Sequence, residues 1–383
     1  MSKILIVTTV PETLDTILRY QPRFLANHFQ VSLATSPGER FEQVAHNEGL
    51  DLFQVPMVRG INALKDLISI FLMIGVLRKV KPTIVHSYTP KAGLVCMLAA
   101  WICRVPVRIH TFTGLVFPTE RGFRQKLLIW VDRLLCACAT HVIPEGAGVK
   151  NDLQRFRITG KSLKLIGHGN IAGVDSGYYS ALAPGLANKA ARLRKSLAIS
   201  ADSFLFCFVG RLNKDKGLDE LIEAFKVLPE KSHLLLVGAL DSTAPISAIT
   251  LKSIESHPRI HCLGFLDDIR PSLLASDVLV LPSYREGFPN VLLQAGAMEL
   301  PVIATDINGS NEVIEPGRNG WLVPVRNSTA LAEAMLRAMQ TPIAVRNELG
   351  RQSRILMQHR FEQKKHWGRM VTFYQALLDR CSK

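Results

Sequence analysis

Short apolar runs rich in β-branched residues recur along the first half of the chain, and segments of helical length separate most of them. This alternation is typical of a parallel sheet that is covered by helices on both faces. One of the intervening helices is predicted over residues 90–103. The predicted strands are ILIVTT (4–9), FQVSLAT (29–35), LFQVP (52–56), TIVHS (83–87), VRIHTF (107–112), THVIP (140–144) and LKLIGH (163–168).

The second half repeats this alternation, with helices predicted over 217–228, 289–299 and 328–340. Its predicted strands are FLFCFVG (204–210), HLLLVG (233–238), RIHCLG (259–264), DVLVLP (277–282), PVIAT (301–305) and GWLVP (320–324). The pattern therefore predicts an α/β protein with two doubly wound, Rossmann-like domains that face each other across a cleft. Because such sheets bind ligands beyond the carboxyl ends of their strands, we expect the functional site in that cleft.

The linker between the two halves is predicted to lie within 176–195, where Pro, Gly and small residues cluster. The chain of 383 residues is long enough for two domains with full cores. We therefore expect a first domain over 1–180, a second over 195–360 and a C-terminal helix within 361–383.

Composition and charge indicate a globular protein and restrict the kinds of partner that it is expected to bind. Hydrophobic residues make up 48% and charged residues 20%, as in a globular protein. Of the net charge of +14, +13 falls in residues 1–195, which suggests that the first half meets an anionic partner. The sequence has neither zinc-finger spacing nor an RNA-recognition aromatic signature, so an anionic membrane surface is favoured over nucleic acid.

Seven cysteines, most of them within apolar runs, favour a reducing cytoplasmic setting. Cys136 and Cys138 lack the second pair that a zinc site needs. The N-terminus is not expected to be a signal peptide. The most apolar stretch, 67–77, is about half the roughly 20 residues needed to span a bilayer. It is either a core helix with snorkelling ends or an amphipathic surface on lipid headgroups, and 121–138 allows the same two interpretations.

The segment FVGRLNKDKGLDELIEAF (208–225) leaves a predicted strand and enters a predicted helix. Arg211 and Lys216 thus lie between the strand end and the helix start, where backbone N–H groups and the helix dipole also attract anions. Arginine holds a phosphate with two donors, and lysine adds a compact charge. The segment is either a phosphate-binding turn or a solvated basic turn.

A polar, irregular segment that carries a carboxylate, SYREGFP (283–289), follows the strand 277–282, and we call it the elbow. Pro289 suits the first turn of the helix that follows. Glu286 precedes this helix at the strand opening, where it can accept hydrogen bonds from sugar hydroxyls, and Gln294 lies further along the helix and can bond a ribose. The alternatives are a capping acid for Glu286 and an ordinary helical amide for Gln294.

The motifs GRLNKDKG (210–217), GFLDD (264–268) and SYREGFPNVLLQAGAMELPVIATDINGSNEVIEPGRNGWLV (283–323) together resemble the family 4 retaining glycosyltransferases of the B-type, two-domain fold. In the first half, TTVPETL (8–14), VHSYTPKAGLVCMLAA (85–100) and VPVRIHTFTG (105–114) resemble the bacterial polysaccharide and lipid-linked oligosaccharide branch. The resemblance implies transfer of a sugar from a nucleoside diphosphate sugar, by default a UDP-linked hexose or N-acetylhexosamine, with retained anomeric configuration.

The resemblance also implies roles for residues. Arg211, Lys216 and Glu286 match the catalytic positions. The donor-binding set that it implies is Gly210, Arg211, Lys216, Gly264, Glu286, Gly287, Phe288, Pro289, Asn290, Gln294, Asn311 and Glu312. It further implies that the C-terminal helix, about 361–380, crosses back to the first domain, with Trp367, Phe373 and Tyr374 as candidate anchors.

Two positions depart from the family pattern. Gln294 stands where a second Glu is usual, and an amide can still bond a ribose. Thr113 and Gly114 stand where a His-Gly pair is frequent, and His110 lies three residues earlier. Either His110 or Thr113 then contacts the sugar, or His110 is simply a strand histidine.

The acceptor is predicted from SYTPKAG (87–93), which places Lys91 at a helix start in the basic half and so forms a second anion-binding site. The alternative is that Lys91 is a surface lysine at a helix start. Lys91, His110, Thr113 and Gly114 form the predicted acceptor site. This site and the basic half suit a polyprenyl-diphosphate-linked saccharide and a peripheral location on the inner face of the cytoplasmic membrane. The family resemblance implies a role in the synthesis of O-antigen, capsule or exopolysaccharide.

The chain contains no Asp-x-Asp triplet, so we expect a metal-independent reaction without a cofactor, in which the basic side chains stabilise the leaving diphosphate. Two alternatives stay open. A nucleotide-sugar 2-epimerase shares the architecture, and a non-catalytic nucleotide-sugar-binding regulator fits the two departures. A dehydrogenase is disfavoured because no strand is followed by G-x-G-x-x-G.

Overall fold

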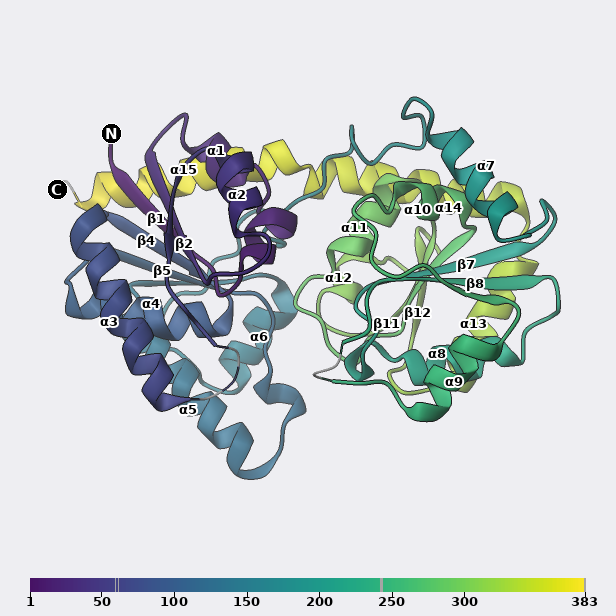
Figure 1. Cartoon of the computed structure of the whole chain (residues 1–383), viewed down its shortest axis with the longest axis horizontal. Helices are drawn as coiled ribbons and strands as arrows, with labels where there is room; N and C mark the ends of the chain where they lie inside the picture. The colour runs from purple at the N-terminus through teal and green to yellow at the C-terminus, as the bar shows by residue number, and fades with distance from the viewer. Residues whose placement is uncertain (59, 61, 242–243, 382–383) are drawn as a thin grey trace. The chain divides into compact units, whose positions relative to one another are not determined.

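Residues 1–58, 60, 62–241 and 244–381, which the computed structural model describes, form two six-stranded sheets of parallel strands (Figure 1). The contacts divide the chain into two units. The first contains Met1–Ala172 together with the C-terminal segment from Gln363, and the second contains Gly173–Glu362. Each sheet is doubly wound, so the predicted α/β architecture is confirmed for both units. Among the described residues, no helix is both long and apolar enough to cross a bilayer.

The sheet of the first unit has the strand order β3-β2-β1-β4-β5-β6. Its strands are β1 (Lys3–Val7), β2 (Gln30–Thr35), β3 (Asp51–Gln54), β4 (Ile84–Tyr88), β5 (Val107–Phe112) and β6 (His141–Pro144). Around it lie η1 (Thr13–Ile17), α1 (Gln21–Leu25), α2 (Phe41–Glu48), α3 (Ala63–Val80), α4 (Pro90–Ile102), η2 (Phe117–Thr119), α5 (Gly122–Cys138), α6 (Ala147–Arg155) and α15 (Gln363–Cys381).

Alternate residues of β1 build two separate cores on the two faces of this sheet. Leu5 and Val7 pack in one core with residues of α3, α4 and α5. Ile4 and Ile6 pack in the other with Met370, Tyr374 and Leu377 of α15. The C-terminal helix thus completes the first unit, and of its predicted anchors Trp367 and Tyr374 are buried while Phe373 is partly buried.

The sheet of the second unit has the strand order β12-β11-β10-β7-β8-β9. Its strands are β7 (Phe204–Val209), β8 (Ser232–Val237), β9 (Ile260–Cys262), β10 (Val278–Leu281), β11 (Val302–Thr305) and β12 (Gly320–Val323). Around it lie α7 (Leu186–Ser196), η3 (Lys214–Lys216), α8 (Leu218–Lys226), α9 (Ala248–Ser256), α10 (Arg270–Ala275), α11 (Asn290–Ala297), α12 (Ser310–Val313), α13 (Ser328–Gln340), α14 (Ile343–Leu356) and η4 (Met357–Phe361).

One strand prediction is wrong. The run 163–168 forms no strand and leads into turns at Gly167 and Gly169, which both have positive φ. The segment 176–195, within which the linker is predicted, contains most of α7, and Leu186 and Ala190 of this helix are buried in the core of the second unit.

Candidate functional site

The candidate site lies at the point where the second sheet reverses its winding direction. From β7 the chain continues through β8 to β9 on one side, and from β10 through β11 to β12 on the other. Because β7 and β10 are neighbouring parallel strands, the segments that follow them emerge at the same edge of the sheet. These segments carry the predicted Arg211 and Lys216 after β7 and the predicted Glu286 after β10.

A close backbone contact brings the two segments together. Gly217 has φ +67°, and a Cβ atom there would lie 2.1 Å from the carbonyl oxygen of Pro282. Only glycine fits such a contact in this conformation without displacing the backbone. The turn before α8 can therefore lie directly against the end of β10.

Lys216 and Glu286 form an ion pair at this contact. Lys216 Nζ donates to Glu286 Oε1 at 2.5 Å, and Ser283 Oγ donates to the same oxygen at 2.7 Å. The two charged side chains are only 19% and 13% exposed, so water screens them less than a surface pair. The structure thus joins two of the three predicted catalytic side chains across 70 residues of sequence.

Arg211 is oriented by a different acid. Its Nη1 donates to Asp241 Oδ2 at 2.6 Å, and Asn213 Nδ2 donates to the same oxygen at 3.2 Å. Arg211 is 62% exposed, whereas Asp241 is 10% exposed. The guanidinium can therefore still reach an anion from solvent while Asp241 limits its orientation.

The remaining predicted donor residues surround this centre in different ways. Phe288 is buried and packs on Phe361 at 5.5 Å between ring centroids, which is a structural contact. A Cβ atom at Gly309 would lie 2.5 Å from the carbonyl oxygen of Gly287, so the segment before α12 passes close to the elbow. Asn311, in α12, donates from Nδ2 to Asp306 at 2.9 Å.

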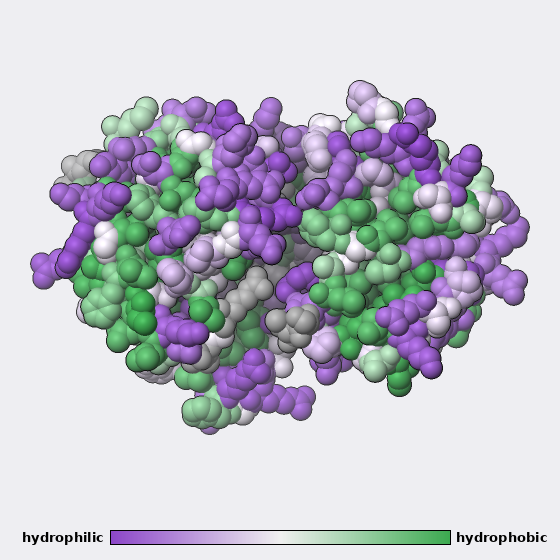
Figure 2. Space-filling model, viewed as in Figure 1, coloured by the Kyte–Doolittle hydropathy of each residue, from purple (hydrophilic) through white to green (hydrophobic). Residues whose placement is uncertain are grey.

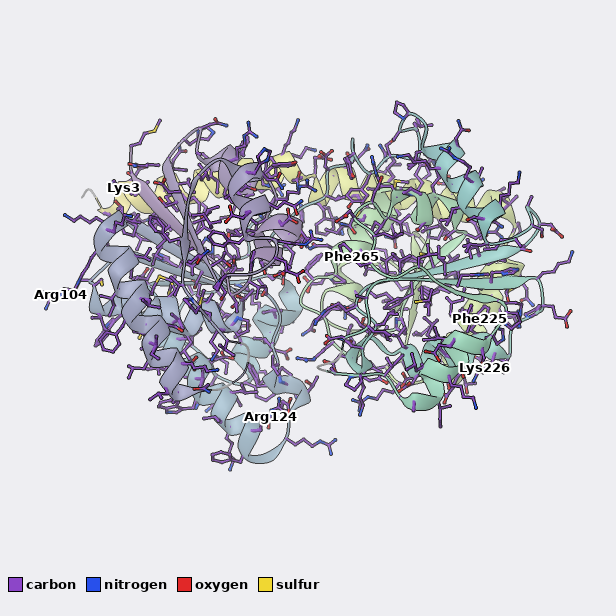
Figure 3. The ribbon with its side chains drawn as sticks, viewed as in Figure 1. Lys3, Arg104, Arg124, Phe225, Lys226 and Phe265 are labelled. Carbon is purple, nitrogen blue, oxygen red and sulfur yellow. The ribbon has the colours of Figure 1, made fainter. Side chains whose placement is uncertain are left out.

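Other predicted donor residues lie on α11 and after β9. Asn290 and Gln294 belong to the first two turns of α11, where both are partly exposed, and Pro289 precedes the helix as its N-cap. Gly264 follows β9 and accepts the backbone N–H of Gly238 at 2.7 Å, and its neighbour Phe265 is exposed (Figure 3).

The predicted acceptor residues lie in the first unit. Lys91 Nζ donates to both carboxylate oxygens of Asp66 on α3, at 2.7 and 2.8 Å, so the predicted anion-binding site already contains an acid. Thr113 and Gly114 follow β5 and are partly exposed.

His110 is an internal residue of β5. It is fully buried, and its Nδ1 lies 2.9 Å from Ser87 Oγ. A Cβ atom at Gly93 would lie 2.4 Å from the imidazole, so α4 packs directly on the ring. Burial lowers the pKa of His110 to about 3, which keeps the imidazole neutral. This environment is typical of the strand histidine that the sequence allowed.

Sequence reasoning missed several partners of the predicted residues. Asp241 follows the end of β8 just as Arg211 follows the end of β7, so strand-end position could have suggested it. Ser283 lies in the elbow itself, but its bond to Glu286 has no sequence signature. Within the part of the chain that the structure describes, no cluster of three His, Cys, Asp or Glu side chains could hold a metal ion.

Comparisons with known proteins identify the family. The model described as "Glycosyl transferases group 1" matches residues 203–341, and "Glycosyl transferase 4-like domain" matches residues 17–166. CapM of Staphylococcus aureus, a capsular polysaccharide biosynthesis glycosyltransferase, is 29% identical over 385 residues, which cover 98% of this chain and 97% of CapM. EpsD of Bacillus subtilis, named as a glycosyltransferase, is 30% identical over 311 residues, 78% of each chain.

A further relative and a solved structure complete the comparison. UDP-Gal:alpha-D-GlcNAc-diphosphoundecaprenol alpha-1,3-galactosyltransferase of Escherichia coli is 28% identical over 299 residues, 76% of this chain and 75% of the relative. HepE of Anabaena, whose structure contains UDP, has a TM-score of 0.81 at 18% identity and covers 98% of this chain and 100% of its own. The chain therefore belongs to the glycosyltransferases, and it has the two-domain B-type fold.

Proposed function

We propose that this glycosyltransferase moves a hexose or N-acetylhexosamine from a UDP sugar to a saccharide linked to a polyprenyl diphosphate. The transfer would retain the anomeric configuration, require no metal ion and contribute to a bacterial surface polysaccharide. A donor with UDP is supported by HepE, which holds UDP, and by the E. coli relative, which is named for UDP-Gal. The lipid-linked acceptor is supported by the diphosphoundecaprenol in the same relative's name.

The observation that carries the proposal is the Lys216–Glu286 pair at the reversal point of the second sheet. A donor diphosphate would take the ammonium of Lys216 and the exposed guanidinium of Arg211, and a sugar hydroxyl would donate to Glu286. As the bond between the anomeric carbon and the diphosphate breaks, its electron pair passes to the diphosphate. The fixed positive charges stabilise this growing negative charge more strongly than water does.

The acceptor hydroxyl would attack the anomeric carbon on the face from which the diphosphate leaves, which retains the configuration, and its proton would pass to the departing diphosphate. Family resemblance is the support for this stereochemistry. Metal independence is supported by the basic side chains at the proposed diphosphate position, and it has a direct test. We expect turnover to persist in EDTA, and a loss that Mn²⁺ or Mg²⁺ restores would contradict it.

A peripheral membrane location on the cytoplasmic side is supported by an exposed apolar surface on α3, α4 and α5. We call it the apolar face, and its exposed side chains are Leu64, Leu67, Ile68, Phe71, Leu72, Trp101, Ile102, Phe123 and Trp130. Figure 2 shows apolar residues gathered over the α3 region. Arg124 on α5 and Arg104 in the turn after α4 are both exposed (Figure 3) and suit anionic headgroups.

The proposal is tested with radiolabelled UDP sugars and bacterial membrane extract. We expect one labelled sugar to enter the lipid phase in a Glu286-dependent way. Two outcomes would contradict transfer: epimer formation from a UDP sugar without acceptor, which indicates a 2-epimerase, or tight donor binding without transfer to any extract lipid, which indicates a regulator.

A further inference from the structure

The elbow that carries Glu286, residues 283–289, follows β10 and belongs to neither a strand nor a helix. Irregular segments of this kind are free to move unless specific contacts hold them. A functional carboxylate needs to stay within a fraction of an ångström of its working position. The structure therefore has to supply contacts that hold this elbow.

Tyr284 is held in the elbow at three points. Its hydroxyl lies 2.7 Å from Oε1 and 2.6 Å from Oε2 of Glu220, in the first turn of α8. Its backbone N–H donates to the carbonyl of Asp215 at 2.8 Å. The guanidinium of Arg326 lies 4.6 Å from the centre of its ring. Hydroxyl, amide and ring are thus all engaged.

The next residue adds a second connection to the same segment. Arg285 donates from Nη2 to Asp215 Oδ2 at 2.6 Å and from Nε at 3.2 Å. This ion pair is partly exposed, so on its own it contributes little to stability. Its importance lies in its position, because Asp215 directly precedes Lys216 and Arg285 directly precedes Glu286.

These contacts join the same two segments as the Lys216–Glu286 pair. Asp215 and Glu220 flank Lys216 on one segment, and Tyr284 and Arg285 precede Glu286 on the other. The Gly217–Pro282 backbone contact lies beside them. Burial, followed by the bond to Glu220, raises the pKa of Tyr284, so its hydroxyl keeps its proton and donates throughout the neutral range.

We infer that Tyr284, held by Glu220, is a positioning residue that sets the distance between Lys216 and Glu286. This inference rests on the proposed function for its effect on catalysis, whereas the structural role stands on the contacts alone. It predicts that loss of one phenolic oxygen loosens the elbow and slows transfer without removing any group that touches the donor.

The test replaces Tyr284 by phenylalanine, which keeps the ring under Arg326 and removes only the bond to Glu220. We expect the backbone amide of residue 284 to exchange with deuterium about tenfold faster in the variant than in the parent protein. We also expect kcat to fall about tenfold with little change in the donor KM. This is the scale of a lost hydrogen bond to a charged acceptor. A merely structural role would lower thermal stability without separating kcat from KM.

Tyr178→Phe is the matched control. Tyr178 belongs to the same unit, is exposed and has Arg270 at 3.6 Å from its ring centre, but lies on a different segment. We expect no change in exchange at the elbow or in kcat for this variant. Glu220→Gln keeps an oxygen that accepts from Tyr284, and we expect it to retain more activity than Tyr284→Phe.

The two proposals fail in different ways. If the parent protein transfers no sugar, the proposed function fails, and the exchange measurement still tests the elbow. If the parent is active and Tyr284→Phe shows unchanged amide exchange or unchanged kcat, the positioning role is overturned.

Discussion

At the scale of single residues, the lysine in each of the two proposed anion-binding sites is already paired with a carboxylate of the protein. Lys216 contacts Glu286, and Lys91 contacts Asp66. A pair of this kind avoids the cost of an isolated, partly buried charge. A ligand diphosphate then has to compete with the carboxylate for the lysine, or share it. The binding energy of each site is therefore the difference between the lysine–diphosphate and lysine–carboxylate contacts.

We predict that Lys216→Met lowers kcat/KM for transfer by about 10²–10³-fold, the usual loss when one charge-stabilising donor is removed. Initial rates at varied donor concentration measure it. Lys214→Met is the control, because Lys214 lies in the same turn η3 and is exposed. A comparable loss in both variants would indicate a general effect of charge rather than a specific role of Lys216.

We predict that Gly217→Ala lowers the free energy of unfolding of the second unit by more than about 2 kcal/mol. The positive φ alone costs about 1–3 kcal/mol for a residue with Cβ, and the contact with Pro282 adds to it. Chemical denaturation measures the loss. Gly185→Ala separates the two causes, because Gly185 has φ +72° in the same unit and nothing within 4 Å of a Cβ. Equal losses would show that the close contact has no cost.

At the scale of elements, α3 has two faces with different roles. Met73, Ile74 and Leu77 pack in the core with α4, as the core-helix interpretation predicts. Leu67, Ile68 and Phe71 of the same helix are exposed, as the amphipathic-surface interpretation predicts. The two interpretations of 67–77 thus describe opposite faces of one helix, because 18 residues make five turns and only one side meets the core.

We predict that Leu67→Ser combined with Phe71→Ser weakens binding to vesicles with anionic lipids by about tenfold or more, because each large apolar side chain contributes about 1.5–3 kcal/mol when it leaves water. Co-sedimentation measures the binding. Ile249→Ser is the control, because Ile249 is exposed and apolar but belongs to the second unit. Unchanged binding of the double variant would argue against the apolar face as the membrane contact.

At the scale of the whole molecule, three buried neutral histidines concentrate in the first unit. Burial lowers the pKa of His110 to about 3 and of His366 to about 4, and it also lowers the pKa of His86. His86 joins β4 to the C-terminal helix through its Nδ1, 2.7 Å from the hydroxyl of Tyr374. Protonation of these rings therefore opposes folding of the unit and attachment of α15.

We predict that the first unit loses stability as the pH falls from about 6.5 to about 4. In this window the unfolded histidines bind protons and the folded ones do not, so stability declines by up to about 1.4 kcal/mol per pH unit for each histidine. Tryptophan fluorescence of Trp321→Phe follows this unit, because Trp101, Trp130 and Trp367 all belong to it. Unfolding that is independent of pH between 4 and 6.5 would contradict the prediction.

The sequence by itself determined the two doubly wound sheets, because hydrophobic period and strand composition are local properties. For each of the 12 strands found among the described residues, both ends lie within two residues of a predicted run. The run 163–168 was wrong since apolar composition alone does not show whether a neighbouring strand exists to pair with it. The position of Arg211, Lys216 and Glu286 between a strand end and a helix start, together with the family motifs, pointed to these residues.

Only the tertiary structure decided which charges meet. The pairing of Lys216 with Glu286, of Arg211 with Asp241 and of Lys91 with Asp66 joins segments that are 70, 30 and 25 residues apart. Such contacts depend on which strands are neighbours and on glycine-sized gaps between backbones, and neither leaves a periodic trace in the chain. The same holds for His110, whose burial under Gly93 is set by helix packing rather than by its neighbours in sequence.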